Sequence, residues 1–261
     1  MENPTVLELK NLTIGFAGGS KPLEILSKVN VRAQQGQLIA LIGANGAGKS
    51  TLIRSLCGLQ PILNGGVWLH GVPAGRLTAG ELATKLSVVL TDKIQAGYLT
   101  VGDLVATGRH PYTDWRGRLQ ETDLNATKEA LKITGLSSLK QEYLHTLSDG
   151  QLQKAMIARA LAQDGALMLL DEPLIHLDIP SKWEIMGLLK QMTKKKQKTI
   201  VLATHELDLS LQIADRIWLI NKYQQLLDET PQEMVQNGHI SAAFDTEYYQ
   251  FQPGSFNRHD K

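Results

Sequence analysis

Residues 43 to 51 have the types and the spacing that hold phosphate groups in nucleotide-binding proteins. They fit the pattern G-x-x-x-x-G-K-[ST], in which glycines turn backbone N–H groups inward, the lysine reaches the β- and γ-phosphates and the hydroxyl ligates Mg²⁺. The apolar run within residues 37–42 indicates a buried strand before the loop, and residues 52–56 indicate a helix after it. Because both flanks fit, a chance Lys-Ser in a Gly-rich turn is the weaker interpretation. The predicted phosphate and Mg²⁺ contacts come from Gly43, Ala44, Asn45, Gly46, Ala47, Gly48, Lys49, Ser50 and Thr51, with Ser50 on the metal.

A pair of carboxylates closes a second apolar run further along the chain. Residues 166–170 are apolar without alternation, as is typical of a central strand in a parallel sheet, and Asp171 and Glu172 follow directly. Because the end of such a strand lies at the nucleotide, we expect Asp171 to hold Mg²⁺ and Glu172 to act as general base toward an attacking water. The alternative is a solvated acidic turn, which is common when such a run stands alone.

The residues Leu-Ser-Asp-Gly-Gln at 147–151 lead into a helical pattern that continues to Ala162. Ser148 is predicted to cap this helix, and its hydroxyl, the Gly150 N–H and the helix dipole would form a second anion site. Taken alone, a capped helix is the simpler interpretation. Together with the phosphate loop and the acidic pair, the segment resembles the signature of the ATP-binding cassette (ABC) ATPases, which usually reads Leu-Ser-Gly-Gly-Gln.

The resemblance covers nearly the whole chain and implies an α/β fold of the P-loop NTPase type. Such a fold has a parallel RecA-like core, an antiparallel β-layer and an inserted helical subdomain. The implied organisation is one nucleotide-binding domain over residues 1–261. Its parts are a catalytic core with the β-layer at 1–92 and 164–221, a helical subdomain at 93–163 and a C-terminal tail at 222–261.

Further site residues follow from the resemblance, position by position. Phe16 matches the aromatic residue that stacks on adenine, although a Phe in a β-strand is equally often a core residue. His205 matches the switch histidine that contacts the γ-phosphate; a polar strand end is its alternative. Asp178 matches the loop that touches the opposite subunit. With Lys49, Glu172 and His205 as the catalytic set, the nucleotide of one chain is expected to meet Ser148, Gly150, Gln151 and Asp178 of a second copy.

The sequence departs from the family at two places. Asp92 stands near the position where the family has a glutamine that ligates Mg²⁺, and Gln95 lies close by. Asp92 is therefore expected to complete the metal set with Ser50 and Asp171, through a water molecule. Leu174 and Ile175 replace residues that are usually smaller, which indicates a local change in packing.

The elements that position these residues follow from the apolar patterns. Strands are expected at residues 6–16, 29–33 and 67–70 in the antiparallel layer. The parallel core is expected to contain the strands before the phosphate loop and the acidic pair, together with residues 199–203 and 216–220. Helices are expected at 101–107, at 124–134 and in the signature segment.

Composition agrees with an ATPase domain in a reducing compartment. The formal net charge of +1 gives no argument for a nucleic-acid partner, and the single Cys57 fits a buried core position without a disulfide. The first residues do not form a signal peptide, and no apolar run approaches the roughly 18 residues of a membrane-spanning helix. We therefore expect a peripheral protein on the cytoplasmic face of the inner membrane, with a separate polytopic permease.

The segment 99–112 is similar to the corresponding segment of the ATPases of importers for iron–siderophore complexes, haem and cobalamin. The resemblance implies ATP and Mg²⁺ as cofactors, an ATP-sandwich homodimer, permease subunits and, indirectly, a substrate-binding protein. The alternatives are another importer, an exporter, or a soluble ABC ATPase of DNA repair or translation. The apolar and aromatic residues expected to line a groove for the permease are Tyr98, Leu99, Val101, Tyr112 and Trp115; packing within the helical subdomain is their alternative.

Overall fold

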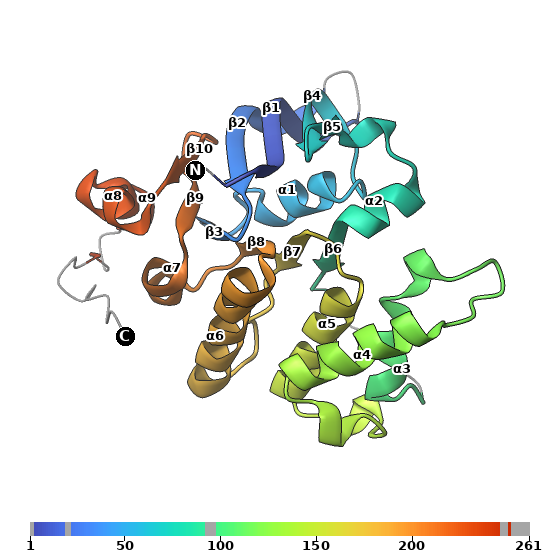
Figure 1. The fold of residues 1–261 in the computed structure, drawn as a ribbon. Coiled ribbons are helices and arrows are strands. Elements are labelled where there is room, and N and C mark those ends of the chain that lie inside the picture. Colours follow the sequence, from blue (N-terminus) through green and yellow to red (C-terminus); the bar gives the residue numbers. More distant parts are fainter. Residues whose placement is uncertain (1–2, 19–21, 92–97, 246–249, 252–261) are drawn as a thin grey trace.

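The computed structural model describes residues 3–18, 22–91, 98–245 and 250–251. A six-stranded sheet forms its centre, in the order β10-β9-β3-β8-β7-β6 (Figure 1). Five strands run parallel and β10 pairs antiparallel with β9. The strands are β3 (Leu38–Gly43), β6 (Leu86–Val89), β7 (Leu167–Asp171), β8 (Thr199–Ala203), β9 (Arg216–Ile220) and β10 (Leu226–Glu229). Every residue of β3, β7 and β8 is buried, which explains why their sequences are apolar without alternation.

A second, antiparallel sheet covers one face of the central sheet. Its order is β2-β1-β4-β5, with β1 at Thr5–Phe16, β2 at Leu23–Gln34, β4 at Ile62–Leu69 and β5 at Val72–Pro73. Helix α1 (Lys49–Leu56) lies between the two sheets, and its buried side chains Leu52, Ile53 and Leu56 join the apolar residues of both in one core (Figure 1). The helix that follows the phosphate loop is thereby clamped on two sides. Helix α2 (Ala79–Lys85) connects this layer to β6.

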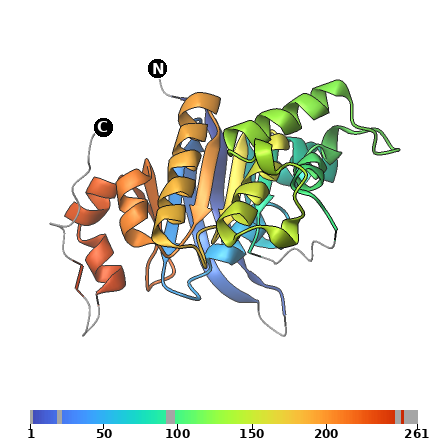
Figure 2. The same cartoon turned by 90° about the horizontal axis from the view of Figure 1, so that it is seen from below.

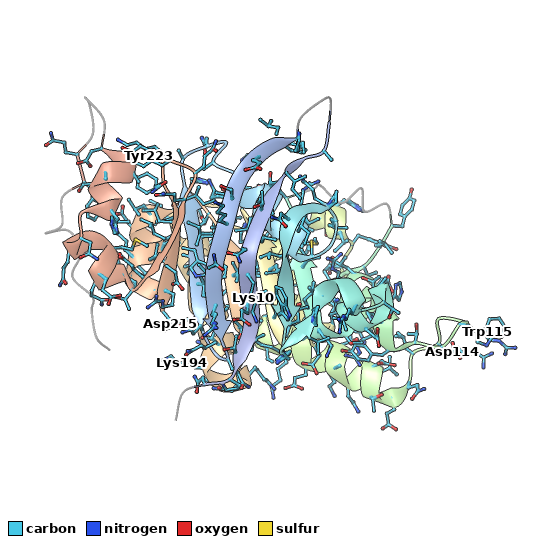
Figure 3. The ribbon with its side chains drawn as sticks, turned by 90° about the horizontal axis from the view of Figure 1, so that it is seen from above. Lys10, Asp114, Trp115, Lys194, Asp215 and Tyr223 are labelled. Atoms are coloured by element: carbon cyan, nitrogen blue, oxygen red, sulfur yellow. The ribbon has the colours of Figure 1, made fainter. Side chains whose placement is uncertain are left out.

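Helices cover the opposite face of the central sheet (Figure 2). These are α5 (Asp149–Ala162), α6 (Ile179–Lys196) and α7 (Leu207–Ile213), and α5 also packs against α3 (Val101–Thr107) and α4 (Glu121–Ile133). Short 3₁₀ turns occupy Ala74–Arg76, His110–Tyr112, Ser137–Leu139 and Leu144–Thr146. The loop between α3 and α4 carries Asp114 and Trp115 to one extreme of the molecule (Figure 3). Among the described residues, no helix is both long enough and apolar enough to cross a membrane.

The C-terminal region is part of the folded core. Strand β10 extends the central sheet, and α8 (Pro231–Gln236) and α9 (His239–Phe244) pack beside it. Ile240 and Phe251 are buried among residues of β3, α7 and β9. These residues of the predicted tail therefore pack on the core.

The elements agree with the sequence patterns and extend them. The predicted parallel core, antiparallel layer and helical region are all present, so the predicted fold class is confirmed. Strands β2 and β4 begin before the predicted residues 29–33 and 67–70. Their first halves are mostly exposed and lack the regular alternation of a core strand, although Leu26 of β2 is buried. Helix α4 begins three residues before the apolar pattern, at Glu121, where a capping box with Gln120 and Asp123 starts it.

Candidate nucleotide-binding site

The phosphate loop joins the end of β3 to the start of α1. Gly48, the residue before the helix, has φ of 104°, and a Cβ there would lie 2.4 Å from the Ile25 side chain. Only glycine fits this position, because it needs both a left-handed backbone and the absence of a side chain. No side chain caps the first turn of α1, so its backbone N–H groups are available to an anion.

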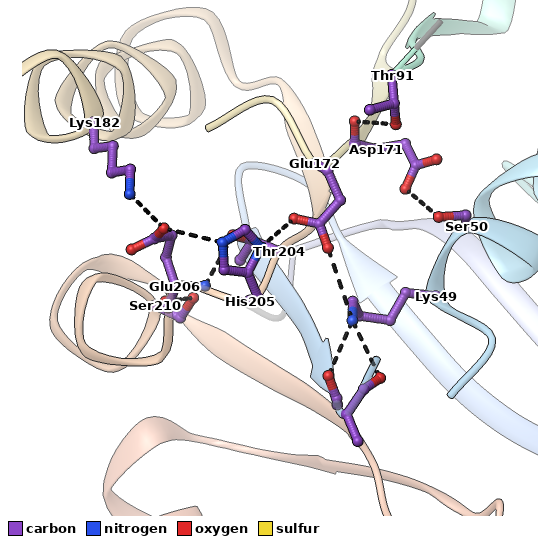
Figure 4. Close-up of polar contacts among 12 residues, drawn as sticks. Lys49, Ser50, Thr91, Asp171, Glu172, Lys182, Thr204, His205, Glu206 and Ser210 are labelled. Atoms are coloured by element: carbon purple, nitrogen blue, oxygen red, sulfur yellow. Dashed lines mark hydrogen bonds and ion pairs between the residues drawn. The ribbon is translucent and has the colours of Figure 1, made fainter. Parts of the chain in front are cut away.

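Lys49 opens helix α1 and points back over the loop that precedes it. Its side chain is 6% exposed, and Nζ donates hydrogen bonds to the backbone oxygens of Gly43 at 2.9 Å and Ala44 at 3.4 Å (Figure 4). The same ammonium lies 3.8 Å from Oε1 of Glu172. A buried lysine held by weak, neutral acceptors can exchange them for phosphate oxygens without crossing a large gap.

Ser50 and Asp171 bring two oxygen ligands together. The Ser50 hydroxyl donates a hydrogen bond of 2.8 Å to Oδ1 of Asp171, which is buried at the end of β7. The Thr91 hydroxyl donates to the backbone oxygen of Asp171 at 3.2 Å and holds this strand end from the other side. Oxygen donors of this kind suit Mg²⁺, which usually keeps several waters and substrate phosphates as its remaining ligands. The described residues contain no cluster of three or more His, Cys, Asp or Glu that could hold a metal ion.

Glu172 leaves the sheet in a left-handed conformation, with φ of 49°. Its N–H donates to the backbone oxygen of Ala203, the last residue of the neighbouring strand β8. The side chain thereby faces His205, whose Nδ1 lies 2.8 Å from Oε2 of Glu172 (Figure 4). The parallel pairing of Asp171 with Ala203 explains this meeting, because it places both strand ends at one edge of the sheet.

The signature residues occupy a different place from the phosphate loop of the same chain. Ser148 caps α5, as predicted: its hydroxyl accepts from the Gln151 N–H at 3.3 Å, and the Gln151 side chain accepts from the Ser148 N–H at 3.0 Å. Asp178 similarly caps α6 by accepting from the Ser181 N–H at 2.9 Å. A Cβ on Gly150 would lie 3.2 Å from the Ser181 hydroxyl, so the starts of α5 and α6 lie side by side.

The structure therefore brings together one group of the predicted residues and leaves a second group apart. The first group is Lys49, Ser50, Asp171, Glu172 and His205. Within the described part of the chain, Ser148, Gln151 and Asp178 have no hydrogen bond to the phosphate loop. Asp92 and Gln95 lie outside the described residues, so the predicted third metal ligand has no structural account.

Phe16 ends β1 with 51% of its surface exposed. It is therefore not a core residue, which removes the packing alternative. It pairs with Leu23 of β2, and Leu23 lines a cavity of about 330 Å³ together with residues 44–47 of the phosphate loop. Phe16 is thus an exposed aromatic residue whose strand neighbour Leu23 borders the loop, on the side of the antiparallel sheet.

The five residues expected to line a permease groove separate into two groups. Val101 is fully buried in the helical region and packs there, so its predicted place in a groove is wrong. Tyr98 and Trp115 are highly exposed, and Leu99 and Tyr112 are partly exposed. The Tyr112 hydroxyl donates to the backbone oxygen of Gln163, so this ring also serves the packing of α5. The sequence could not separate these cases, because all five residues are apolar or aromatic.

Three polar residues near the site were not anticipated from the sequence. The Thr91 hydroxyl donates to the backbone oxygen of Asp171. Glu206 contacts His205 on the side away from Glu172, and Lys182 donates to Glu206. Glu206 directly follows His205 in the sequence, which is the one signal that could have drawn attention to it.

Comparisons with known proteins agree with this geometry. The sequence profile of the family described as "ABC transporter" matches residues 26–175. The petrobactin import ATP-binding protein FpuD of Bacillus anthracis is 34% identical over 88% of this chain and 82% of its own length. The ferric enterobactin transport ATP-binding protein FepC of Escherichia coli is 32% identical over 90% and 85%.

Solved structures give the same result. CbiO1 of Clostridium perfringens, described as part of the ABC transporter complex CbiONQ, has a TM-score of 0.79 and 27% identity, covering 91% of this chain and 93% of that one. A bacterial ABC transporter cassette solved as a dimer has a TM-score of 0.71 and 27% identity, covering 86% and 98%. This chain belongs to the ABC transporter family of ATP-binding proteins.

Proposed function

We propose that this chain is the ATP-hydrolysing subunit of an ABC importer for an iron complex, either a siderophore or haem, or for cobalamin. The observation that carries the substrate class is the likeness to proteins named for import of petrobactin and transport of ferric enterobactin, over most of the chain. The segment 99–112 supports the same group. The chain is proposed to work at the cytoplasmic face of the inner membrane, docked on a separate permease. A substrate-binding protein would deliver the solute to that permease.

ATP binding begins, in this proposal, with an exchange of partners at Lys49. Its Nζ leaves the backbone oxygens of Gly43 and Ala44 for the β- and γ-phosphates, while the N–H groups of residues 44–51 and the first turn of α1 surround the phosphates. Phe16 stacks on the adenine ring from the side of the antiparallel sheet. Each group is already within reach of the loop, so binding requires little rearrangement.

Mg²⁺ is proposed to be held by Ser50 and Asp171, with Asp92 contributing through water. The 2.8 Å contact between the Ser50 hydroxyl and the Asp171 carboxylate supports this, because a hard cation can insert between two oxygens already this close. When bound, the ion neutralises charge that develops on the phosphates. Thr91 and β7 keep the carboxylate in place.

Hydrolysis depends on Glu172 in this proposal. Its carboxylate accepts the proton of the attacking water, a role worth about 10²–10⁴-fold in rate. His205 holds Oε2 of Glu172 and contacts the γ-phosphate. The Lys49 ammonium stabilises the negative charge of the γ-phosphate. The distances of 2.8 Å and 3.8 Å that join Glu172 to His205 and Lys49 support a single catalytic group.

A second copy of the chain is proposed to complete each site. Ser148, Gly150, Gln151 and Asp178 lie apart from the phosphate loop of their own chain, and a family member of similar fold is a dimer. Two nucleotides would then be enclosed between phosphate loop and signature in a head-to-tail homodimer. The proposed division of each copy is a core at 1–92 and 164–221, a helical subdomain at 93–163 and a tail at 222–261.

The experiment that tests the substrate class is reconstitution of the chain with its permease and substrate-binding protein. ATP hydrolysis is measured with ferric siderophores, haem, cobalamin and unrelated solutes. Stimulation by one of the first three supports the proposal. Stimulation only by an unrelated solute would indicate another importer, and hydrolysis coupled to outward movement would indicate an exporter.

A further inference from the structure

His205 has a carboxylate on each side of its ring. Nδ1 lies 2.8 Å from Oε2 of Glu172, and Nε2 lies 3.3 Å from Oε1 of Glu206 (Figure 4). The His205 side chain is 47% exposed, so packing alone does not fix the orientation of its ring. In the part of the chain that the structure describes, these two carboxylates are the polar contacts of the imidazole.

Glu206 is itself held firmly. Its N–H donates to the Thr204 hydroxyl at 3.1 Å, and its backbone oxygen accepts from the Ser210 hydroxyl at 2.6 Å. Thr204 and Ser210 are both fully buried, which fixes the backbone on either side of the carboxylate. The direction of the Glu206 side chain is thus set by the strand end and by the first turn of α7.

Lys182 completes the arrangement from the first turn of α6. Its Nζ donates a hydrogen bond of 2.6 Å to Oε1 of Glu206, the same oxygen that faces His205. A neutral imidazole has only one N–H, so it can donate to only one of the two carboxylates. The Lys182 ammonium offsets the charge on Glu206, which leaves the shorter contact, to Glu172, as the one that His205 serves.

We propose that Glu206, held by Lys182, is a positioning residue for the switch histidine. The ion pair fixes the Glu206 carboxylate beside Nε2, where it limits rotation of the ring. Lys182 is the donor to Oε1 of Glu206, so the single imidazole N–H stays on the catalytic carboxylate. This inference rests on the proposed hydrolysis of ATP and adds residues that act through His205 without touching the nucleotide. Lys182 and Glu206 each retain about a fifth of their side-chain surface, so the pair is only partly screened by water.

The competing explanation is that Lys182 and Glu206 only fasten α6 to α7. The same helix provides a matched control, the ion pair between Lys190 and Asp215. It has the same length of 2.6 Å and similar exposure, 24% and 29% against 20% and 21%, but Asp215 bonds to the Leu38 N–H at the start of β3. Lys190→Met therefore reports what loss of an ion pair on α6 does to folding alone.

The test measures kcat and KM for ATP and the thermal midpoint of the full chain, alone and with its permease. We expect Lys182→Met and Glu206→Gln to lower kcat on the order of tenfold, the usual effect of removing a group that orients a functional side chain, with KM within about twofold. Lys182→Arg should retain most of the rate. Lys190→Met should lower the midpoint and leave kcat unchanged.

The charge-reversed double variant Lys182→Glu/Glu206→Lys gives the decisive comparison. It rebuilds an ion pair between α6 and α7 but places an ammonium against His205, so it should recover the midpoint and not kcat. In a His205→Ala background, Glu206→Gln should have no further effect on kcat. Recovery of kcat by the charge reversal, or a kcat for Lys182→Met equal to that of Lys190→Met, would overturn the inference. Absence of hydrolysis in the unaltered chain would instead overturn the proposed function.

Discussion

The Ser50 hydroxyl lies 2.8 Å from the Asp171 carboxylate, although 121 positions separate the two residues in the chain. Ser50 lies on α1, which follows β3, and Asp171 ends β7. Strands β3 and β7 are not neighbours, because β8 runs between them in the sheet. The contact therefore depends on α1 reaching across the strand ends from β3 toward β7. This reach places Ser50 at the proposed metal site, next to Asp171 and Glu172.

Replacing Glu172 with Gln keeps the shape of the side chain and removes the proposed base. We expect multiple-turnover ATP hydrolysis to fall by 10²–10⁴-fold, with ATP still bound, because Lys49 and the loop remain intact. ATP-bound dimer should accumulate, measured by size-exclusion chromatography with retained nucleotide. Glu184, an exposed glutamate on α6, provides the control. Glu184→Gln removes one carboxylate charge in the same way, and this variant should hydrolyse ATP at the normal rate. Unchanged turnover in Glu172→Gln would remove it from the catalytic role.

Replacing Phe16 with Ala should weaken ATP binding without affecting the phosphates. Stacking of a base on an aromatic ring contributes about 1–3 kcal/mol, so the Kd for ATP should rise roughly 5- to 150-fold. Phe16→Tyr should restore binding. Inorganic triphosphate, which has no base, should bind both variants equally, and Trp115→Ala, at the far end of the molecule, should behave as the unaltered chain. Equal loss of triphosphate binding would indicate a disturbed loop rather than lost stacking.

Lys49→Ala and Ser148→Arg are each expected to abolish hydrolysis. If two copies share each site, a mixed dimer has one site with both an intact Lys49 and an intact Ser148. Mixing the two variants should then recover nucleotide trapping, with at most one competent site per dimer. Trapping is measured after heterodimers have been shown by differential tags. No recovery in such heterodimers would contradict the shared site.

The buried pair of Arg109 and Asp123 should stabilise the helical region. Arg109 donates to Asp123 at 2.9 Å and to the backbone oxygen of Ala162 at 2.7 Å, so it joins the end of α3 to α4 and α5. Removing one partner of a buried pair costs about 3–5 kcal/mol of unfolding free energy, and we expect such a loss for Asp123→Asn at neutral pH. Glu121 is an exposed residue in the same first turn of α4, so Glu121→Gln should have little effect on the unfolding free energy.

The pH dependence of this stabilisation has a definite sign. The backbone N–H of Gln120 and the Arg109 guanidinium hold the pKa of Asp123 below its ordinary value. A lowered pKa in the folded state stabilises the protein above the unfolded pKa of about 4, and this contribution is lost as the pH falls further. The difference in unfolding free energy between the unaltered chain and Asp123→Asn should therefore narrow below about pH 4, as measured by urea titration. A constant difference would show that Asp123 acts by shape alone.

Much of the fold could be predicted because motif and element coincide. A phosphate loop requires a strand before it and a helix after it, so residues 43–51 placed β3 and α1 together. The unbroken apolar runs at 166–170 and 200–203 likewise identified central strands. Parallel strands end at one edge, so the sequence could place Glu172 and His205 at the same edge, while their direct contact depends on β7 and β8 being neighbours.

Other features depend on distances that no sequence pattern contains. Whether Phe16 is exposed depends on where β1 leaves the antiparallel sheet, which its own residues do not determine. Lys182 meets Glu206 only because α6 packs on α7, and the spacing of the two residues in the chain gives no sign of that contact. Val101 and Leu99 are both apolar and two positions apart, yet Val101 at the start of α3 is buried and Leu99, before the helix, is exposed.

The position of β8 between β3 and β7 also determines how late in synthesis of the chain the site can form. Residues 43–51 and 171–172 are synthesised before the strand that both β3 and β7 pair with. At about 5–20 residues per second, the phosphate loop exists for on the order of ten seconds before β8 can join it to the acidic pair. Truncated products that end before residue 199 lack this strand and His205, so we expect them to bind nucleotide more weakly than the full chain and to be more sensitive to proteases.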